Sequence, residues 1–258
     1  MLLANRMVAE HIPRGKALRL FIYRIHDEPN NEQIAMLSSL LKHLDLPGLP
    51  SRDVSSKEVR DLLLAMEDSP YRDLIKTITL RSMAKAVYSA SNRGHFGLAF
   101  SAYTHFTSPI RRYADLVVHR LLVEHLGTVK SKWSTSEEYF AKVANQCSQR
   151  EQVAIEAERT YSRLKELRFL ATQIGNCFDG IISGVTPKGI FVQIQEFLVD
   201  GFISIDWLES DEYIFNERHF ALEGRRLKRV LQLGQEVHIK VRDVSIENRY
   251  AHFLLATD

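Results

Sequence analysis

The stretch GHFGLAFSAYTHFTSPIRRYADLVVHRLL, residues 94–122, gathers aromatic rings, histidines and two adjacent arginines. Its second half predicts a helix over 109–126, with Ser108 as N-cap and Pro109 at the first helical position, where proline is favoured. Arg111 and Arg112 then lie in or beside the first turn of that helix. Because the helix macrodipole disfavours cations there by about 0.3–1 kcal/mol each, helix stability does not explain the pair.

A bound anion does explain it. Free N–H groups at a helix start and guanidinium groups both bind phosphate, and arginine adds planar, bidentate geometry. The alternative is an internal ion pair, because Asp115 follows Arg111 by four residues and Arg112 by three. One carboxylate neutralises only one arginine, so we expect the other to face a ligand.

The composition is that of a folded protein. The chain has 258 residues, of which 45% are hydrophobic and 26% charged, with a net charge of +2. No apolar run approaches the roughly 20 residues that span a membrane, and no signal-peptide pattern precedes Arg6. Two cysteines are too few for a disulfide scaffold or a four-ligand zinc site. We expect a cytoplasmic protein with no membrane partner.

The charge is unevenly distributed along the chain. Residues 1–170 carry a net charge of +6 and residues 171–258 a net charge of −4. Long-range attraction of an anionic polymer is therefore expected mostly in the first part.

The hydrophobic pattern changes near Gly175. Before it helical periodicity dominates, including a helix over 71–89 and a long helix that ends near 172 and begins with a capping box at Ser134 and Glu137. After it come five short β-branched or aromatic runs separated by Gly, Pro and Asp. Five such strands suit a small closed barrel. The predicted fold is α+β, with a mostly helical domain over 1–172 and a five-stranded OB-fold barrel over 173–258.

Residues 94–122 closely resemble the signature of the ribonuclease R/ribonuclease II family of 3′→5′ exoribonucleases, in the C-terminal half of their RNB domain. The resemblance extends over MLLANRMVAEHI (1–12), YRIH (23–26), LRSMAKAVYS (80–89) and AERTYSRLKELRFL (157–170). The barrel is similar to the S1 RNA-binding domain of these enzymes. The resemblance implies the C-terminal portion of an enzyme that binds single-stranded RNA and, when complete, hydrolyses it to nucleoside 5′-monophosphates.

The same resemblance assigns site residues. The arginine of the TSPIR motif, which contacts the phosphate next to the scissile bond in the family, falls on Arg111. The glutamate of the AER motif, which lines the catalytic cavity, falls on Glu158. These two are the expected catalytic residues, and His95, Tyr103 and Arg112 match motif positions that are expected to bind RNA. From the residues alone, Glu158 is better interpreted as an exposed helix carboxylate paired with Arg163 or Lys165.

The barrel is expected to contribute further RNA contacts. Phe191 falls on a position where S1 domains stack bases, and Arg249 is a further match. Lys188 stands where many such barrels carry another aromatic residue, Ser204 where a His is common and Ser245 where an Asp is common. The expected RNA contacts of this face are Phe191, Lys188 and Arg249. The histidines 125, 219, 238 and 252 show no metal-ligand spacing and are interpreted as ordinary surface or barrel residues.

A basic cluster interrupts this acidic domain. EGRRLKRVL, residues 223–231, holds four cations, of which Arg225 and Arg226 are the expected contacts to an RNA backbone. The alternative is a solvated basic loop.

The metal ligands of the family are missing from this chain. The resemblance implies Mg²⁺ held by aspartates in a D-x5-D-x-D-D pattern, which activates water for phosphodiester hydrolysis. The chain has no adjacent Asp pair and no D-x-D; Asp200 and Asp206 match only the first spacing. We expect no metal ligands here, an inactive isolated chain, and the N-terminal half of the enzyme as a candidate partner. The alternatives are a catalytically inactive RNA-binding module or regulator, and a structural remnant that folds poorly.

Overall fold

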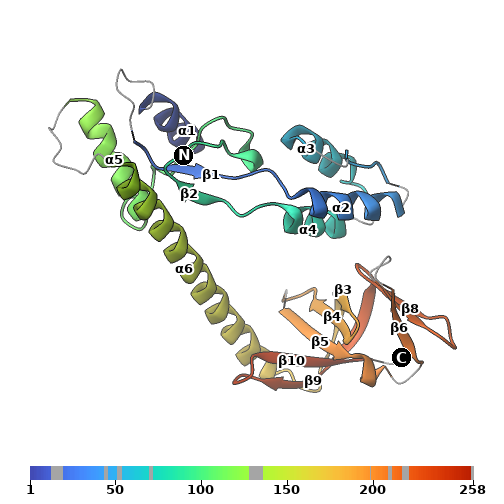
Figure 1. The fold of residues 1–258 in the computed structure, drawn as a ribbon. Coiled ribbons are helices and arrows are strands. Elements are labelled where there is room, and N and C mark those ends of the chain that lie inside the picture. The colour runs from blue at the N-terminus through green and yellow to red at the C-terminus, as the bar shows by residue number, and fades with distance from the viewer. Residues whose placement is uncertain are drawn as a thin grey trace. The chain divides into compact units, whose positions relative to one another are not determined.

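The computed structural model describes residues 1–12, 20–43, 46–50, 54–69, 72–127, 136–197, 199–208, 211–216 and 221–256. Its elements, shown in Figure 1, are α1 (Leu2–His11), β1 (Tyr23–Ile25), α2 (Asn31–His43), α3 (Ser56–Ala65), α4 (Arg72–Ser82), β2 (Val87–Ser89), η2 (Phe96–Leu98), α5 (Tyr113–His125), α6 (Glu137–Ala171), β3 (Cys177–Thr186), β4 (Gly189–Ile194), β5 (Val199–Ser204), η3 (Ile205–Trp207), β6 (Tyr213–Asn216), β7 (Ala221–Gly224), β8 (Val230–Gln232), β9 (Glu236–Ser245) and β10 (Tyr250–Leu255).

The chain forms two compact units. The first comprises Met1–Leu41, Pro47–Glu67 and Thr77–Ile155, and the second comprises Lys42–Leu46, Asp68–Lys76 and Glu156–Asp258. The helix α6 contributes its first part to one unit and its last part to the other. No described helix combines the length and apolar character needed to cross a membrane.

The first unit is built on a small antiparallel sheet of β1 and β2. Tyr23 pairs with Ser89 and Ile25 with Val87. Apolar residues before and within β1, from α1 and α5, and from the start of α6 form its core. The helix predicted over 71–89 is wrong at its end, because α4 stops at Ser82 and the β-branched and aromatic residues that follow pair with β1.

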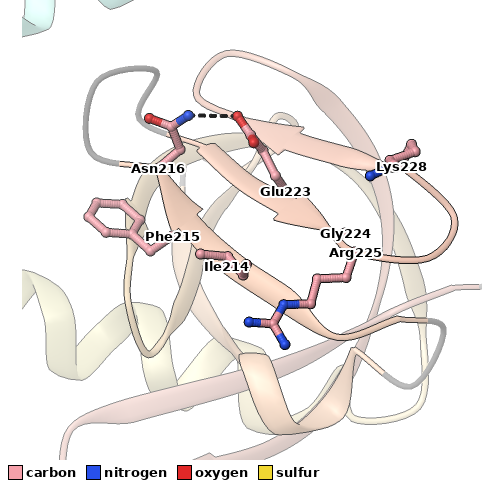
Figure 2. A pocket seen from close by; sticks show the side chains of 7 residues that line it. All are labelled: Ile214, Phe215, Asn216, Glu223, Gly224, Arg225 and Lys228. Carbon is pink, nitrogen blue, oxygen red and sulfur yellow. Dashed lines mark hydrogen bonds between the residues drawn. The ribbon is translucent and has the colours of Figure 1, made fainter.

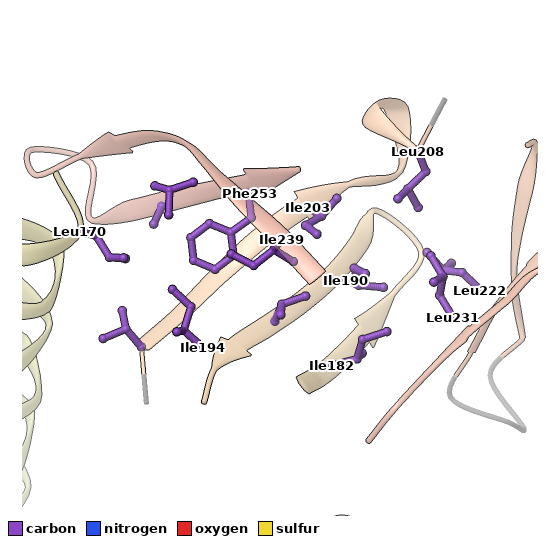
Figure 3. Packing of buried hydrophobic residues seen from close by; sticks show 14 of the residues in the cluster. Leu170, Ile182, Ile190, Ile194, Ile203, Leu208, Leu222, Leu231, Ile239 and Phe253 are labelled. Atoms are coloured by element: carbon purple, nitrogen blue, oxygen red, sulfur yellow. The ribbon is translucent and has the colours of Figure 1, made fainter. Parts of the chain in front are cut away.

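The second unit contains a closed barrel in the order β10-β5-β4-β3-β9, which confirms the predicted five-stranded OB-fold. Pairing is antiparallel except between β10 and β5. Figure 3 shows its core, which includes Ile190, Ile203, Ile239 and Phe253. Gly201 is required by this packing, since a Cβ there would lie 2.3 Å from the Phe253 ring.

Two features of this unit differ from the sequence interpretation. Leu167 and Leu170 of α6 belong to the barrel core, so the last turns of the long helix pack with the barrel. In addition, β6, β7 and β8 form a separate three-stranded antiparallel sheet that the sequence analysis did not predict. Ser134 of the expected capping box lies outside the described residues.

Candidate nucleic-acid interface

The start of α5 is determined by one buried carboxylate. Asp115 is fully buried, and its Oδ1 accepts hydrogen bonds from the backbone N–H of Ser108 and from the Arg112 guanidinium, both at 2.8 Å. The N–H groups of Arg111 and Arg112 both donate to the Ser108 carbonyl. Residues 108–112 therefore form a turn that contains Pro109, and α5 begins only at Tyr113. The predicted helix start at Pro109 is wrong.

The two arginines are separated by this turn. Arg112 is the N-cap residue of α5 and is bound to Asp115, and its side chain is largely buried. Arg111 is exposed, and within the described part of the chain it has no ion-pair or hydrogen-bond partner for its side chain. The Asp115 carboxylate therefore pairs with only one of the two arginines, as the sequence indicated. Arg111 is the arginine that remains accessible to an anion.

His95 lies beside an open hollow of about 730 Å³ that is lined by residues 26–28, 92–96 and 99–101. Its ring contacts His26 at 5.1 Å and Tyr103 at 5.2 Å between centroids. Burial, with smaller contributions from His26 and Arg24, lowers the pKa of His95 to about 4. His95 is therefore neutral at pH 7 and can contact RNA through hydrogen bonds or its ring, and not as a cation.

Tyr103, one of the residues expected to bind RNA, lies inside the fold. Its side chain is only 5% exposed, and its hydroxyl accepts a hydrogen bond from the Asn5 amide at 2.9 Å. The ring packs against His95, Phe100 and His105. Tyr103 supports the cluster around His95 from within the fold.

Hydrogen bonds orient the rings of two further histidines of this cluster. Gly97 N–H donates to Nδ1 of His26 at 2.8 Å, so its Nε2 carries the proton and donates to the Ala84 carbonyl at 2.6 Å. Burial, with Arg112 and Arg24 nearby, lowers the pKa of His105 to about 3. The hydroxyl of Tyr88 accordingly donates to its Nδ1 at 2.8 Å. The accessible positive charge near the 94–112 segment thus comes from arginine.

Glu158 is exposed on α6, in the part of the helix that belongs to the second unit. Neither alternative partner is bound to it. Arg163 pairs with Glu166 and donates to the Asp200 carbonyl, while the Lys165 ammonium lies 5.3 Å from the Tyr161 ring centroid. The structure therefore removes the ion pairs that offered a purely structural explanation of Glu158.

The expected RNA contacts of the barrel lie at its surface. Phe191 on β4 is 42% exposed, and its ring is 5.0 Å from that of Phe202. Lys188 is exposed in the turn between β3 and β4, and Arg249 is exposed in the turn between β9 and β10, with φ of 58°.

The two serines of this face are engaged in local turns. The hydroxyl of Ser204 accepts from the N–H of Asp206, and that of Ser245 accepts from the N–H of Asn248. Neither residue supplies a ring or a charge to the barrel surface.

The basic cluster lies on the β7–β8 connection. Asp211 accepts hydrogen bonds from the backbone N–H groups of Arg226 at 2.8 Å and Leu227 at 2.6 Å, which fixes the loop. Gly224 leaves room for this carboxylate, because a Cβ there would lie 2.3 Å from its Oδ2. Arg225 is exposed and pairs with Glu212 at 3.0 Å. The cluster is thus a solvated loop with a defined backbone.

A shallow hollow of about 460 Å³ lies beside this loop. Figure 2 shows its lining: the apolar Ile214 and Phe215 of β6, the hydrogen-bonded Asn216 and Glu223, and the cations Arg225 and Lys228. The sequence analysis did not foresee this surface, because its strands have only three or four residues each.

The comparisons with known proteins agree with this architecture. Residues 1–128 match the RNB domain, and residues 172–255 match the S1 RNA binding domain. The chain is 37% identical to Ribonuclease R of Aquifex aeolicus over 97% of its length, and 36% identical to Ribonuclease R of Escherichia coli over 99%. The chain therefore contains an RNB segment followed by an S1 RNA binding domain. It spans about a third of these relatives, covering 35% and 32% of their lengths.

A solved ribonuclease R has the same fold. Mycoplasma genitalium RNase R in complex with ribose methylated single-stranded RNA is 31% identical, with a TM-score of 0.89 over 99% of this chain and 40% of that protein. Its apo form gives the same TM-score of 0.89.

The described residues do not provide the metal site that the ribonuclease R resemblance implies. Nowhere among them do three His, Cys, Asp or Glu side chains come together in a group that could hold a metal ion. Mg²⁺ prefers oxygen ligands, mainly carboxylates with bound water. The donor set of the described residues therefore does not fit the ion.

Proposed function

We propose that this chain is the C-terminal, RNA-holding portion of a cytoplasmic 3′→5′ exoribonuclease. The observation that carries the proposal is the succession of an RNB segment and an S1 barrel, at 36–37% identity to ribonuclease R over nearly the whole chain. The substrate is single-stranded RNA, and the products of the complete enzyme are nucleoside 5′-monophosphates.

Arg111 binds the phosphate next to the bond that is cleaved. The support is its exposure, its lack of a partner within the described residues, and the commitment of Arg112 to Asp115. Arg112 then acts as a positioning residue that holds the 108–112 turn, and His95 contacts the strand as a neutral ring. Glu158 is the second residue of the catalytic cavity.

Hydrolysis depends on Mg²⁺ ligands that this chain does not supply. We propose that they come from the aspartate-bearing half of the RNB domain, joined to this chain or provided as a separate partner. Alone, the chain binds RNA and leaves it intact. This assignment distinguishes an enzyme portion from a permanently inactive module, because only the former gains activity when the other half is added.

Two measurements on the purified chain test the proposal. The first is the affinity for a fluorescein-labelled single-stranded oligoadenylate, measured by anisotropy. Arg111→Ala should weaken binding about 10-fold or more, since a hydrogen-bonded contact to a charged group contributes about 1.5–3 kcal/mol. Arg60→Ala, which removes an exposed arginine of α3, is the matched control and should leave the affinity unchanged.

The second measurement follows the RNA itself. With Mg²⁺ or Mn²⁺ the isolated chain should release no mononucleotides, and addition of an aspartate-bearing RNB half should start their release. Mononucleotide release by the isolated chain would refute the assignment of the metal ligands to the other half. Equal binding by the Arg111 and Arg60 variants would refute the role of Arg111.

A further inference from the structure

The segment that leads into the 108–112 turn is held by side chains from two helices. Phe106 lies two residues before Ser108 and belongs to neither a helix nor a strand. Its backbone N–H donates to Oδ1 of Asn5 on α1 at 3.1 Å. Its carbonyl accepts a hydrogen bond from Nε2 of His119 on α5 at 2.7 Å. Both backbone groups of one loop residue are therefore bound by side chains, which we call the Phe106 clamp.

The two side chains of the Phe106 clamp are themselves fixed. Asn5 is only 4% exposed, and its amide donates to the Tyr103 hydroxyl at 2.9 Å, so both ends of its side chain are bound. The His119 ring is stacked on the Phe106 ring, with centroids 4.1 Å apart and an interplanar angle of 12°. Neither side chain can turn away from Phe106 without losing a second contact.

The same segment is bound to β1 and to the residue before it. The N–H of Arg24 donates to the Tyr103 carbonyl at 2.8 Å. Thr104 is 1% exposed, and its hydroxyl donates to the Ile22 carbonyl at 2.6 Å. The segment is thus held along its length, up to the turn that carries Arg111.

The simplest structural explanation is that buried backbone groups of a loop need hydrogen-bond partners. This explains why Phe106 is bound, but the consequence extends to Arg111. The Ser108 carbonyl, two residues after Phe106, accepts the N–H of Arg111 at 3.3 Å. The Arg111 side chain has no partner among the described residues, so its direction follows from its backbone alone. Because a displacement of about 1 Å in a positioned group can cost on the order of 100-fold, the placement of this segment bears on phosphate binding.

We propose that Asn5 and His119 are positioning residues for Arg111. By holding Phe106 at both backbone groups they place the Ser108 carbonyl, and with it the turn from which Arg111 reaches a phosphate of the RNA strand. The proposal rests on the phosphate-binding role proposed above and adds the residues that set its geometry. Asn5 is buried and His119 is bound to Phe106, so both act through Arg111 and not by contacting RNA.

The test on His119 separates its hydrogen bond from its ring. His119→Phe keeps a ring that can stack on Phe106 and removes the donor, whereas His119→Gln keeps an N–H donor and removes the ring. Binding of a labelled single-stranded oligoadenylate to the full chain is measured by anisotropy. His119→Phe should bind at least about fivefold more weakly, because Arg111 is misplaced, and His119→Gln should bind as the unaltered chain does. His125→Phe on the same helix is the matched control and should keep full affinity.

The test on Asn5 uses Asn5→Leu, which keeps the side-chain volume and cannot bind Phe106 or Tyr103. The affinity should again fall at least about fivefold, for the same reason. The matched control is Ser38→Ala, because Ser38 is 3% exposed and its hydroxyl donates to the Leu49 carbonyl on another part of the first unit. This control should lower the melting temperature and leave the affinity unchanged.

A coupling measurement distinguishes positioning from general destabilisation. In an Arg111→Ala background the guanidinium is absent, so His119→Phe and Asn5→Leu should weaken binding no further. A general loosening of the first unit would instead weaken binding by the same factor with and without Arg111.

Full affinity of folded His119→Phe and Asn5→Leu, or an equal loss in both backgrounds, would overturn the role of the Phe106 clamp. If Arg111→Ala still weakened binding in that case, the proposed function would stand, whereas unchanged binding by Arg111→Ala would overturn both. Should Asn5→Leu not fold, Tyr103→Phe removes only the acceptor of the Asn5 amide. Its effect on binding must then disappear in the Arg111→Ala background, or the proposal fails.

Discussion

At the scale of single residues, Asp115 decides which arginine is available. Its buried carboxylate binds Ser108 and Arg112, so Arg111 is the accessible cation. The sequence predicted the competition between the two arginines from the spacing of three and four residues. It placed the helix start incorrectly because local signals favour Ser108 and Pro109, whereas the side chain of Asp115, seven residues after Ser108, folds that segment into a turn.

The buried histidines make the stability of the first unit depend on pH. The pKa of His105 is lowered by burial, and further by Arg112 and Arg24, to about 3 from an ordinary value of 6.5. Between these values the unfolded chain binds more protons than the folded one. The contribution of neutral His105 is therefore complete above about pH 6.5 and is lost as the pH falls toward 3.

We expect the free energy of unfolding to fall between pH 7 and pH 5, and to fall less in His105→Gln. Glutamine can still accept a hydrogen bond from Tyr88 and does not titrate. Urea denaturation at the two pH values, followed by circular dichroism, measures both slopes. Identical slopes in the two proteins would show that His105 does not contribute to the dependence.

At the scale of elements, the strand predictions were correct where apolar residues alternate along the sequence, because that alternation indicates a strand with one buried face. Strands β4 and β9 were found because every second residue is apolar and faces the barrel core. The sheet of β6, β7 and β8 was missed because its strands are short and its pairing depends on contacts between segments. The ring contacts of His252 were missed for a related reason: the sequence shows an isolated histidine, and only strand register brings Phe202 and Tyr250 next to it.

The loop between β7 and β8 illustrates how one side chain can fix an element. The Asp211 carboxylate accepts backbone hydrogen bonds from Arg226 and Leu227. In Asp211→Ala these N–H groups lose a charged acceptor, a contribution of about 1.5–3 kcal/mol. We expect their hydrogen exchange to accelerate by about 10-fold or more.

The matched control is Glu212→Ala. It removes the exposed side-chain pair with Arg225, which contributes only about 0–1 kcal/mol, and leaves the backbone bonds of Asp211 in place. Exchange at Arg226 and Leu227 should stay slow in this variant. Equal acceleration in both variants would indicate that the charge of the region, and not the Asp211 bonds, holds the loop.

At the scale of the whole molecule, a continuous helix obscures the division of the chain. The sequence analysis placed the boundary at 172–173, where helical periodicity ends, and the match to the S1 RNA binding domain begins at residue 172. Contacts divide the chain within α6, after Ile155, because Leu167 and Leu170 point into the barrel core. Helical periodicity in the sequence indicates that Leu167 and Leu170 belong to a helix, but it does not indicate which hydrophobic core they pack in.

The distribution of charge leads to a prediction about salt. The second part of the chain is net negative, so its four-cation loop can add phosphate contacts only locally. Binding to a single strand weakens with salt at a slope of about −0.7 per phosphate contact in a double-logarithmic plot. Reversing the charge of Arg225 and Arg226 together should therefore make the slope shallower by up to about 1.4.

Anisotropy titrations of oligoadenylate between 50 and 200 mM salt, roughly the range over which counterion release dominates, measure this slope. The control reverses Lys57 and Arg60 on α3, which changes the net charge equally. Because the net charge is matched, only a difference between the two double variants reports contact at the loop. Equal slopes would show that the β7–β8 loop does not contribute phosphate contacts to the RNA affinity of this chain.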